Sequence, residues 1–374
     1  MINRRRLVDT FMTLAGIDSV SRRERGVVDH LAVRLGDLGL EYTEDGAGNV
    51  INGTAGNIVA RLPGTVPGPT LLFCTHMDTV EPGNGVKPRV EGHAIRSGGD
   101  TILGADDKAG MAAVLEAVTV LKEQGLPHPK LELVFTVSEE IGLLGIKEID
   151  FGRLESVMGF VLDSDGTPGK VITRAPSQDR IVATVVGRAA HAGINPEDGV
   201  NAIQAAARAI ADLPLGRIDE ETTANIGVIR GGQATNIIPE RVHLEGETRS
   251  LDNNKRRSLT EHICRIMTER VEAAGAQIKI EVEQIYSSFA LEPDTRPVRM
   301  ALKAAANVGL VAAIEQTGGG SDANVLNEHG IPTVNISTGM RKVHSTEEYL
   351  LIEDLVNTTR HVLEIIRLAG LNKE

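Results

Sequence analysis

The strongest constraint on the fold is an alternation of short apolar runs and helical segments between about residues 69 and 180. The runs at 70–75, 131–137 and 158–162 carry little charge, which is the pattern of strands buried on both faces. A helix that ends at Gly125 separates the first two runs. Its apolar side chains are Met111, Val114, Leu115, Val118 and Leu121. This alternation predicts an α/β fold in which helices cover a mainly parallel sheet.

A different pattern begins near residue 180. Its segments are strand, helix, strand, strand, helix and strand, at 180–186, 201–213, 224–229, 241–248, 258–274 and 277–285. This β-α-β-β-α-β order is that of the ferredoxin-like unit, which forms a compact domain of its own. We therefore expect a ferredoxin-like domain inserted into the α/β domain.

The α/β pattern resumes after the insertion, with helices at 298–307 and 351–368 on either side of a strand at 332–337. These segments are expected to rejoin the first sheet, so that the first domain is discontinuous. A chain of 374 residues is long enough for two domains. The predicted boundaries are 1–178 and 289–374 for the discontinuous domain and 179–288 for the inserted domain.

Charge and composition limit the possible partners and location. The net charge of −12 argues against nucleic acid, because phosphate binding needs a clustered Lys/Arg surface. The basic start at 4–6 is followed by Leu7, Phe11 and Leu14 at helical spacing, so we expect an amphipathic helix rather than a targeting segment. No run approaches the roughly 20 apolar residues of a membrane span. The two cysteines are too far apart in sequence for a disulfide framework, so a cytoplasmic protein without a membrane partner is expected.

Residues with possible chemical roles follow the predicted strands. His76 and Asp78 are two apart at the end of the first run, so both side chains leave the same face of the sheet. A carboxylate beside a ligand imidazole fixes its tautomer, although most pairs of this kind are local hydrogen bonds. Asp106 and Asp107 precede a helix, where capping is the default role, but two carboxylates exceed what a cap needs.

Glu139 and Glu140 arrive together at the end of the second run. Solvent could screen their repulsion, a cation could lie between them, or one could have a raised pKa and act as an acid or base. Asp163 and Asp165 follow the third run, and His344 lies near the C-terminus.

The carboxyl ends of parallel strands meet at one edge of a sheet, where α/β proteins bind ligands. Two histidines and several carboxylates suit two zinc ions bridged by one carboxylate.

Four motifs, at 75–80, 104–110, 138–142 and 190–193, resemble those of the co-catalytic zinc peptidase family. That family includes peptidase T, aminoacylase, carboxypeptidase G and succinyl-diaminopimelate desuccinylase. The resemblance continues at 232–239 and 320–324 and follows the family's order along nearly the whole chain. It identifies the inserted ferredoxin-like domain with the family's lid and dimerisation domain.

The resemblance implies a complete set of metal ligands. One zinc would be held by His76, Asp106 and Asp165, and the other by Asp106, Glu140 and His344. Asp163 stays open as the alternative to Asp165, which is preferred because Gly166 follows it. Cobalt or manganese is expected to replace zinc, because imidazole and carboxylate ligands do not select strictly.

The resemblance also implies roles beside the metals. Asp106 would be the bridging ligand, followed by a cis peptide bond that gives Asp107 a structural role. Asp78 would orient His76, and Glu139 would be the general base.

In the inserted domain, His191 resembles a histidine that reaches from one subunit into the partner's site and stabilises an oxyanion. A turn histidine is its alternative reading. Asn236 and Arg249 resemble residues that bind the substrate backbone and carboxylate, with turn or surface roles as alternatives. At Gly320, in the run 318–320, we expect close approach of the backbone to substrate.

These implications predict a homodimeric di-zinc enzyme that hydrolyses an amide bond in a small peptide, as a tripeptide aminopeptidase does. Hydrolysis of an N-acyl amino acid, or a carboxypeptidase reaction, is the alternative on the same site. A protein that binds metal or peptide without catalysis is a further alternative, and the intact Glu139 argues against it.

Overall fold

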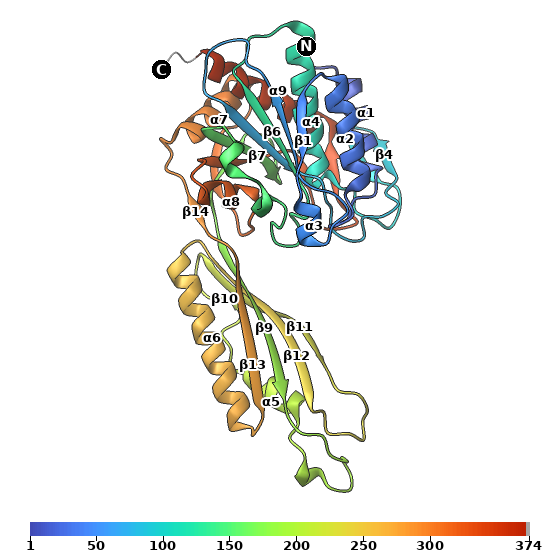
Figure 1. The fold of residues 1–374 in the computed structure, drawn as a ribbon, viewed down its shortest axis with the longest axis vertical. Coiled ribbons are helices and arrows are strands. Elements are labelled where there is room, and N and C mark those ends of the chain that lie inside the picture. The colour runs from blue at the N-terminus through green and yellow to red at the C-terminus, as the bar shows by residue number, and fades with distance from the viewer. Residues whose placement is uncertain (372–374) are drawn as a thin grey trace. The chain divides into compact units, whose positions relative to one another are not determined.

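The computed structural model describes residues 1–371, which form two compact units (Figure 1). The first unit contains, among the described residues, Met1–Arg174, Ala290–Thr317 and 321–371. The second contains Ala175–Phe289 and Gly318–Gly320.

A nine-stranded sheet forms the centre of the first unit. In sheet order its strands are β1 (Glu41–Glu44), β2 (Ile58–Leu62), β6 (Leu131–Thr136), β3 (Leu71–His76), β7 (Met158–Ser164), β16 (Thr333–Ser337), β8 (Lys170–Ala175) and β14 (Phe289–Ala290), and β15 (Ala313–Gln316) also pairs with β8. The four central strands β6, β3, β7 and β16 are parallel, whereas β2 and β8 join them antiparallel. The expected mainly parallel sheet is therefore confirmed.

Helices cover this sheet, which explains why every residue of β3 and β6 is buried. The helices of the first unit are α1 (Arg4–Ala15), α2 (Arg25–Asp37), α3 (Ala47–Ile51), α4 (Ala105–Gln124), α7 (Arg296–Asn307), α8 (Asp322–Glu328) and α9 (Ile352–Leu371). Helix α4 packs against β3 and β7, and α1 and α9 pack against α4. In α1 the expected apolar face is present, since Leu7, Phe11 and Leu14 are buried. Across residues 1–371, no helix has both the length and the apolar character to cross a membrane.

Smaller elements complete the first unit. A four-stranded sheet has the order β17 (Met340–Arg341), β18 (Tyr349–Leu351), β5 (Ala94–Ser97) and β4 (Pro88–Glu91). Two 3₁₀ turns, η1 (Ile146–Glu148) and η2 (Phe151–Arg153), precede β7. The antiparallel pair β17 and β18 holds both ends of the loop that carries His344.

The second unit has the predicted β-α-β-β-α-β order, with one additional two-residue strand, β10, at the edge of its sheet. Its elements are β9 (Ser177–Val186), η3 (Pro196–Asp198), α5 (Ala202–Ala211), β10 (Gly216–Arg217), β11 (Thr222–Gly231), β12 (Arg241–Ser250), α6 (Asn253–Ala273) and β13 (Gln277–Tyr286). The sheet is antiparallel with the order β10-β11-β12-β9-β13, and α5 and α6 pack against each other and against its strands (Figure 1). Alternate residues of β9, at Ile181, Ala183 and Val185, are buried in the core with both helices. The ferredoxin-like arrangement is confirmed.

Candidate functional site

The carboxyl edge of the central parallel strands gathers the predicted ligands. His76 is the last residue of β3, and Asp163 lies one residue before the end of β7. Glu139 and Glu140 follow β6, and Asp106 stands at the beginning of α4. Because β3, β6 and β7 are adjacent and parallel, their ends bring these side chains together.

Asp106 connects the two histidines through different oxygen atoms. Its Oδ1 lies 3.0 Å from Nε2 of His76, and its Oδ2 lies 3.2 Å from Nε2 of His344. The carboxylate is largely buried, with 10% of the side chain exposed. Such a group can place one oxygen on each of two neighbouring cations, which is what the sequence predicted for a bridging ligand.

Glu140 and His344 form the other side of the cluster. Each carboxylate oxygen of Glu140 lies 3.1 Å from Nε2 of His344. His344 has a φ of 60°, and its half-exposed side chain comes from the loop between β17 and β18. This loop therefore delivers an imidazole from the C-terminal part of the chain to the strand ends.

The acidic residue that joins His76 from the end of β7 is Asp163. Its Oδ1 lies 3.7 Å from Nε2 of His76, whereas Asp165 is exposed and is not part of this cluster. The side chain of Asn335, in β16, fixes the backbone at Asp163. It accepts a hydrogen bond from the N–H of Asp163 at 2.9 Å and donates one to the carbonyl of Asp163 at 2.8 Å. This geometry therefore favours Asp163, the alternative that the sequence left open, over Asp165 as the candidate ligand.

Asp78 contacts both the imidazole and the glutamate pair. Nδ1 of His76 lies 3.0 Å from the carbonyl oxygen of Asp78 and 3.5 Å from its carboxylate. That carboxylate accepts hydrogen bonds from the backbone N–H groups of Glu139 at 2.9 Å and Glu140 at 3.2 Å. Ser21 donates a further hydrogen bond to it at 2.6 Å. Asp78 thus positions the loop after β6 as well as facing His76.

The cluster carries an excess of negative charge in a buried space. Burial raises the pKa of Glu139 and of Asp163 well above their usual ranges, and nearby carboxylates raise both further. Burial alone would raise the pKa of Asp106, but hydrogen bonds with His344 and His76 hold it below its usual range. Burial alone would lower the pKa of His76, but hydrogen bonds with Asp106 and Asp163 hold it well above its usual range. Hydrogen bonds to carboxylates raise the pKa of His344 to about 10. A cation in this space would be stabilised by the surrounding oxygen atoms.

The donor atoms fit a metal site. In two groups of residues, His76 with Asp106 and Glu140, and His76 with Glu139 and Asp163, the possible ligand atoms lie within 4.8 Å of one another. All are imidazole nitrogens or carboxylate oxygens, which suit zinc, cobalt or manganese. The nearby thiol of Cys74 instead donates to Asp322 at 3.4 Å, so it is not part of the donor set.

The start of α4 is irregular where it carries the acidic pair. Gly104 has a φ of 75°, which favours glycine, and both Asp106 and Asp107 have non-helical dihedral angles. The peptide bond between the two aspartates is cis, as expected. Asp107 is fully buried and accepts a hydrogen bond from the N–H of Gly110 at 3.1 Å, which is a structural role.

Sequence reasoning missed two buried groups beside the site. Nζ of Lys108 donates to Ser19 at 2.7 Å and to the carbonyl of Met77 at 2.5 Å, and burial lowers the pKa of this lysine to about 8. The Glu348 carboxylate accepts hydrogen bonds from the N–H groups of Leu103, Gly104 and Asp106, at 2.7, 2.7 and 3.1 Å. The two acidic residues after His344 were visible in the sequence, but nothing there distinguished the buried one.

The remaining predicted residues belong to the second unit. His191 is exposed, and its Nδ1 accepts hydrogen bonds from the N–H groups of Gly193 and Ile194 at 3.1 and 3.2 Å. The carbonyl of Asn236 accepts from the N–H of Ala192 at 3.0 Å, so the two loops are joined.

Arg249 and Gly320 have partners inside the second unit. The guanidinium of Arg249 already pairs with Glu247, through bonds of 2.9 and 3.0 Å. A Cβ at Gly320 would lie 2.3 Å from the ring of Tyr286. The close approach that the glycine permits in this structure is therefore to that ring.

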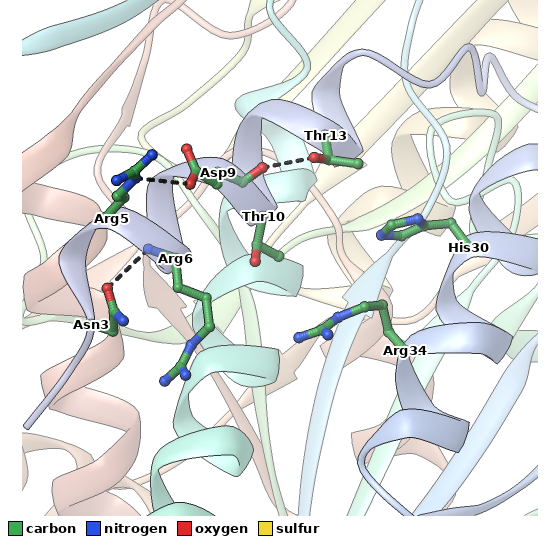
Figure 2. Close-up of a pocket in the computed structure, with 8 residues that line it drawn as sticks. All are labelled: Asn3, Arg5, Arg6, Asp9, Thr10, Thr13, His30 and Arg34. Atoms are coloured by element: carbon green, nitrogen blue, oxygen red, sulfur yellow. Dashed lines mark hydrogen bonds and ion pairs between the residues drawn. The ribbon is translucent and has the colours of Figure 1, made fainter.

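A cavity of about 370 Å³ lies elsewhere, between residues 3–13 around α1 and His30 and Arg34 of α2 (Figure 2). Arg6, one of its cationic residues, is bound by Glu116 and Glu123, and Arg5 lies 3.7 Å from Asp9. Burial lowers the pKa of His30. Most of the positive charge around this cavity is thus compensated, and none of the predicted site residues lines it.

Two peptidase family models match this chain, one in each part. Residues 57–169 match peptidase family M28, and residues 180–274 match the M20 peptidase dimerisation domain. The uncharacterized protein YqjE of Bacillus subtilis is 43% identical over 99% of this chain and 100% of the relative. Aminopeptidase PepT of Bacillus cereus is 43% identical over 98% of each chain, with a TM-score of 0.88. A tripeptidase of Staphylococcus aureus is 40% identical over 100% of each chain, with a TM-score of 0.95.

Proposed function

Because the chain belongs to the M20 family of metallopeptidases, we propose that it is a tripeptide aminopeptidase that removes the N-terminal residue of a short peptide at a two-metal site. The observation that carries this proposal is the position of Asp106, whose two oxygens face one histidine each, at 3.0 and 3.2 Å. A carboxylate placed in this way is suited to bridging two cations.

The residues divide into two ligand sets that share Asp106. His76, Asp106 and Asp163 would hold one zinc ion, and Asp106, Glu140 and His344 would hold the other. When bound, the metals supply Lewis-acid stabilisation of the amide oxygen and lower the pKa of the attacking water. Metal identity is part of the proposal, since the same ligands accept cobalt or manganese.

Glu139 would act as the general base. Glu139 is 7% exposed, and its N–H donates to Asp78 at 2.9 Å, which fixes the backbone from which its carboxylate reaches His76 and Asp163. It would take a proton from the attacking water and deliver it to the amine that leaves. Because one carboxylate performs both proton transfers, the reaction needs no other acid.

The second unit would act as lid and dimerisation domain. Its match to the M20 dimerisation domain supports a homodimer, and the loop that presents His191 is fixed by hydrogen bonds to residues 236–238. We include in the proposal that His191 stabilises the oxyanion of the partner's reaction and that Asn236 binds the substrate backbone. Location in the cytoplasm stays a prediction.

The test is a turnover assay on tripeptides, dipeptides and N-acyl amino acids, with and without a chelator. We expect release of the N-terminal amino acid from tripeptides, loss of turnover with chelator, and recovery on adding zinc. Turnover of N-acyl amino acids instead would establish the deacylase alternative, and release of the C-terminal residue would establish a carboxypeptidase. Tight binding of metal without any turnover would identify a binding protein.

A further inference from the structure

Lys108 is a buried cation beside the candidate metal ligands, and no step of the proposed reaction uses it. It lies two residues after Asp106, near the start of α4, and is 1% exposed. No carboxylate of residues 1–371 forms an ion pair with its ammonium group. Burying an unpaired charge costs free energy, so the charge at this position must be compensated by other contacts.

The ammonium group is bound instead by two segments that are distant in sequence. Its Nζ donates to the carbonyl of Met77 at 2.5 Å and to the hydroxyl of Ser19 at 2.7 Å. Hydrogen bonds from a charged donor are stronger than those between neutral groups. One side chain of α4 therefore holds both the turn after β3 and the segment that precedes α2.

The carbonyl that Lys108 binds belongs to the residue between His76 and Asp78. The N–H of Met77 donates to the carbonyl of Thr136 in β6 at 2.8 Å, so both polar groups of this backbone unit are occupied. Because a peptide bond is planar, a fixed carbonyl at Met77 also fixes the position at which Asp78 begins. The backbone on both sides of Met77 is thus restrained.

The segment that contains Ser19 restrains the same turn from another side. The carbonyl of Ser19 accepts from the N–H of Thr79 at 3.0 Å, and the N–H of Ser21 donates to the carbonyl of Thr79 at 3.3 Å. The hydroxyl of Ser21 donates to the carboxylate of Asp78 at 2.6 Å. The turn after β3 is therefore held directly by the ammonium group and indirectly through this segment.

We propose that Lys108 is a positioning residue of the metal site, which holds the turn after β3 against the start of α4 and so keeps His76 aligned with Asp106. These two candidate ligands lie on the two segments that Lys108 joins, and their nearest atoms are 3.0 Å apart. The inference rests on the proposed two-metal function and adds a residue that would touch neither metal nor peptide. Groups that orient metal ligands usually change metal affinity by about 10- to 100-fold.

The experiment titrates the metal-free full chain with cobalt and compares the wild type with Lys108→Met, Ser19→Ala, the double variant and Lys122→Met. Methionine is similar in length to lysine but donates no hydrogen bond. Lys122 is the matched control, because it is an exposed lysine in the last turn of the same helix.

For Lys108→Met we expect cobalt affinity to fall by about 10- to 100-fold, together with a changed visible spectrum of the bound cobalt. Ser19→Ala should show a smaller loss. The double variant should bind cobalt no more weakly than Lys108→Met, because both substitutions remove the same contact. Lys122→Met should match the wild type.

A second pair of measurements separates positioning from stability. Replacing a buried charge by an apolar side chain of similar size is often neutral or stabilising, so the midpoint of urea unfolding of metal-free Lys108→Met should not fall. At saturating cobalt, kcat on a tripeptide should fall by about 10- to 100-fold while KM stays near the wild-type value, because misplaced reacting groups affect the transition state more than substrate binding.

The other outcomes have distinct meanings. Equal or tighter cobalt binding by Lys108→Met would overturn the inference, and so would a loss of affinity that is accompanied by a lower unfolding midpoint. If Lys108→Met does not fold without metal, Ser19→Ala decides alone, and unchanged affinity in that variant overturns the inference. If the variants lose cobalt affinity as expected but the metal-loaded wild type hydrolyses no peptide, the positioning role stands and the proposed function fails.

Discussion

At the scale of single residues, the candidate site depends on carboxylates that serve two neighbours at once. Asp106 faces both histidines, and Asp78 faces His76 while accepting the N–H groups of Glu139 and Glu140. Their two oxygens are directed at different partners, so a substitution that keeps the shape but removes one acceptor still breaks a connection. Because Glu139 and Glu140 have different neighbours, substitutions can test their roles one at a time.

Replacing Glu139 by Gln is expected to lower kcat by about 10² to 10⁴-fold, the usual contribution of a positioned general base. Metal content should stay at the wild-type value, because Glu140 rather than Glu139 faces His344. Glu140→Gln is the matched control and should empty one of the two metal positions. Elemental analysis together with kcat decides between them, and a Glu139→Gln protein that loses metal would reverse the two assignments.

Asp163 and Asp165 provide a second separable pair. Asp163→Asn is expected to weaken metal binding by at least about 10-fold, because it replaces a ligand carboxylate next to His76 by a neutral amide. Asp165→Asn, the exposed control, should bind metal as the wild type does. Isothermal titration of metal-free protein with zinc or cobalt measures both affinities. A larger loss for Asp165→Asn would restore the ligand preferred from the sequence.

The same pair shows what a single sequence can reveal. Residues 163 and 165 are two apart after a strand, so the alternation of side chains assigns them to the same face. The distinguishing contact is the Asn335 clamp on Asp163, and that residue comes from β16, far away in the chain. Lys108 was missed for a similar reason, because its partners Ser19 and Met77 lie outside its own motif.

At the scale of elements, Glu348 connects two loops that bear proposed ligands. It follows His344 in the loop between β17 and β18, and its buried carboxylate accepts three N–H groups from the loop that leads to Asp106. Within residues 1–371, no cation neutralises it; the backbone amides alone satisfy it. One side chain therefore fixes the loop of His344 to the start of α4.

Replacing Glu348 by Gln should weaken metal binding by about 10- to 100-fold, as loss of a group that orients a ligand usually does. The amide presents an NH₂ group to backbone N–H donors in either orientation, so at least one bond is lost. Glu347→Gln is the matched control, because Glu347 is exposed and pairs only with Lys342 among the described residues. Cobalt titration of the metal-free variants measures the effect. Equal affinities in the two variants would contradict this connection.

The elements that could be predicted were those with a long periodic signal. Helices α4, α5, α6, α7 and α9 and strands β3, β6, β7, β9, β11, β12, β13 and β16 lie within a few residues of their expected bounds. Helix α2 was not assigned, although Val27, Leu31 and Leu35 are buried at helical spacing. The short strands β4, β5, β17 and β18 were also not assigned, because two to four residues carry no measurable period. They form two local antiparallel pairs, β4 with β5 and β17 with β18, and the pairing of β5 with the sequence-distant β18 joins these pairs into one sheet.

At the scale of the whole molecule, the candidate metal ligands and the segment that matches a dimerisation domain lie in different units. The two ligand sets lie in the first unit, whereas the match to the dimerisation domain lies in the second. The predicted boundaries at 178 and 289 remain predictions; contact between residues divides the chain at 174 and 290 and assigns Gly318–Gly320 to the second unit. Those glycines are distant in sequence from the rest of that unit, so no local pattern could have placed them there.

If the protein is a homodimer and His191 acts on the partner's substrate, two inactive variants should complement each other. The sheet of the second unit has edge strands, β13 among them, that pairing between two copies would cover. Alone, His191→Ala and Glu139→Gln should each be nearly inactive. In a heterodimer of the two, one site would contain both lesions and the other site neither.

Random re-association of equal amounts makes about half of the dimers mixed, so recovered activity should reach about one quarter of the wild-type value. The control mixes Glu139→Gln with a chain that carries both substitutions, which cannot form an intact site in any combination. Subunit exchange is followed by mass spectrometry of differently tagged chains. If exchange is complete and activity does not exceed the average of the separate variants, His191 does not act across the interface, and a monomer by light scattering would remove the basis of the prediction.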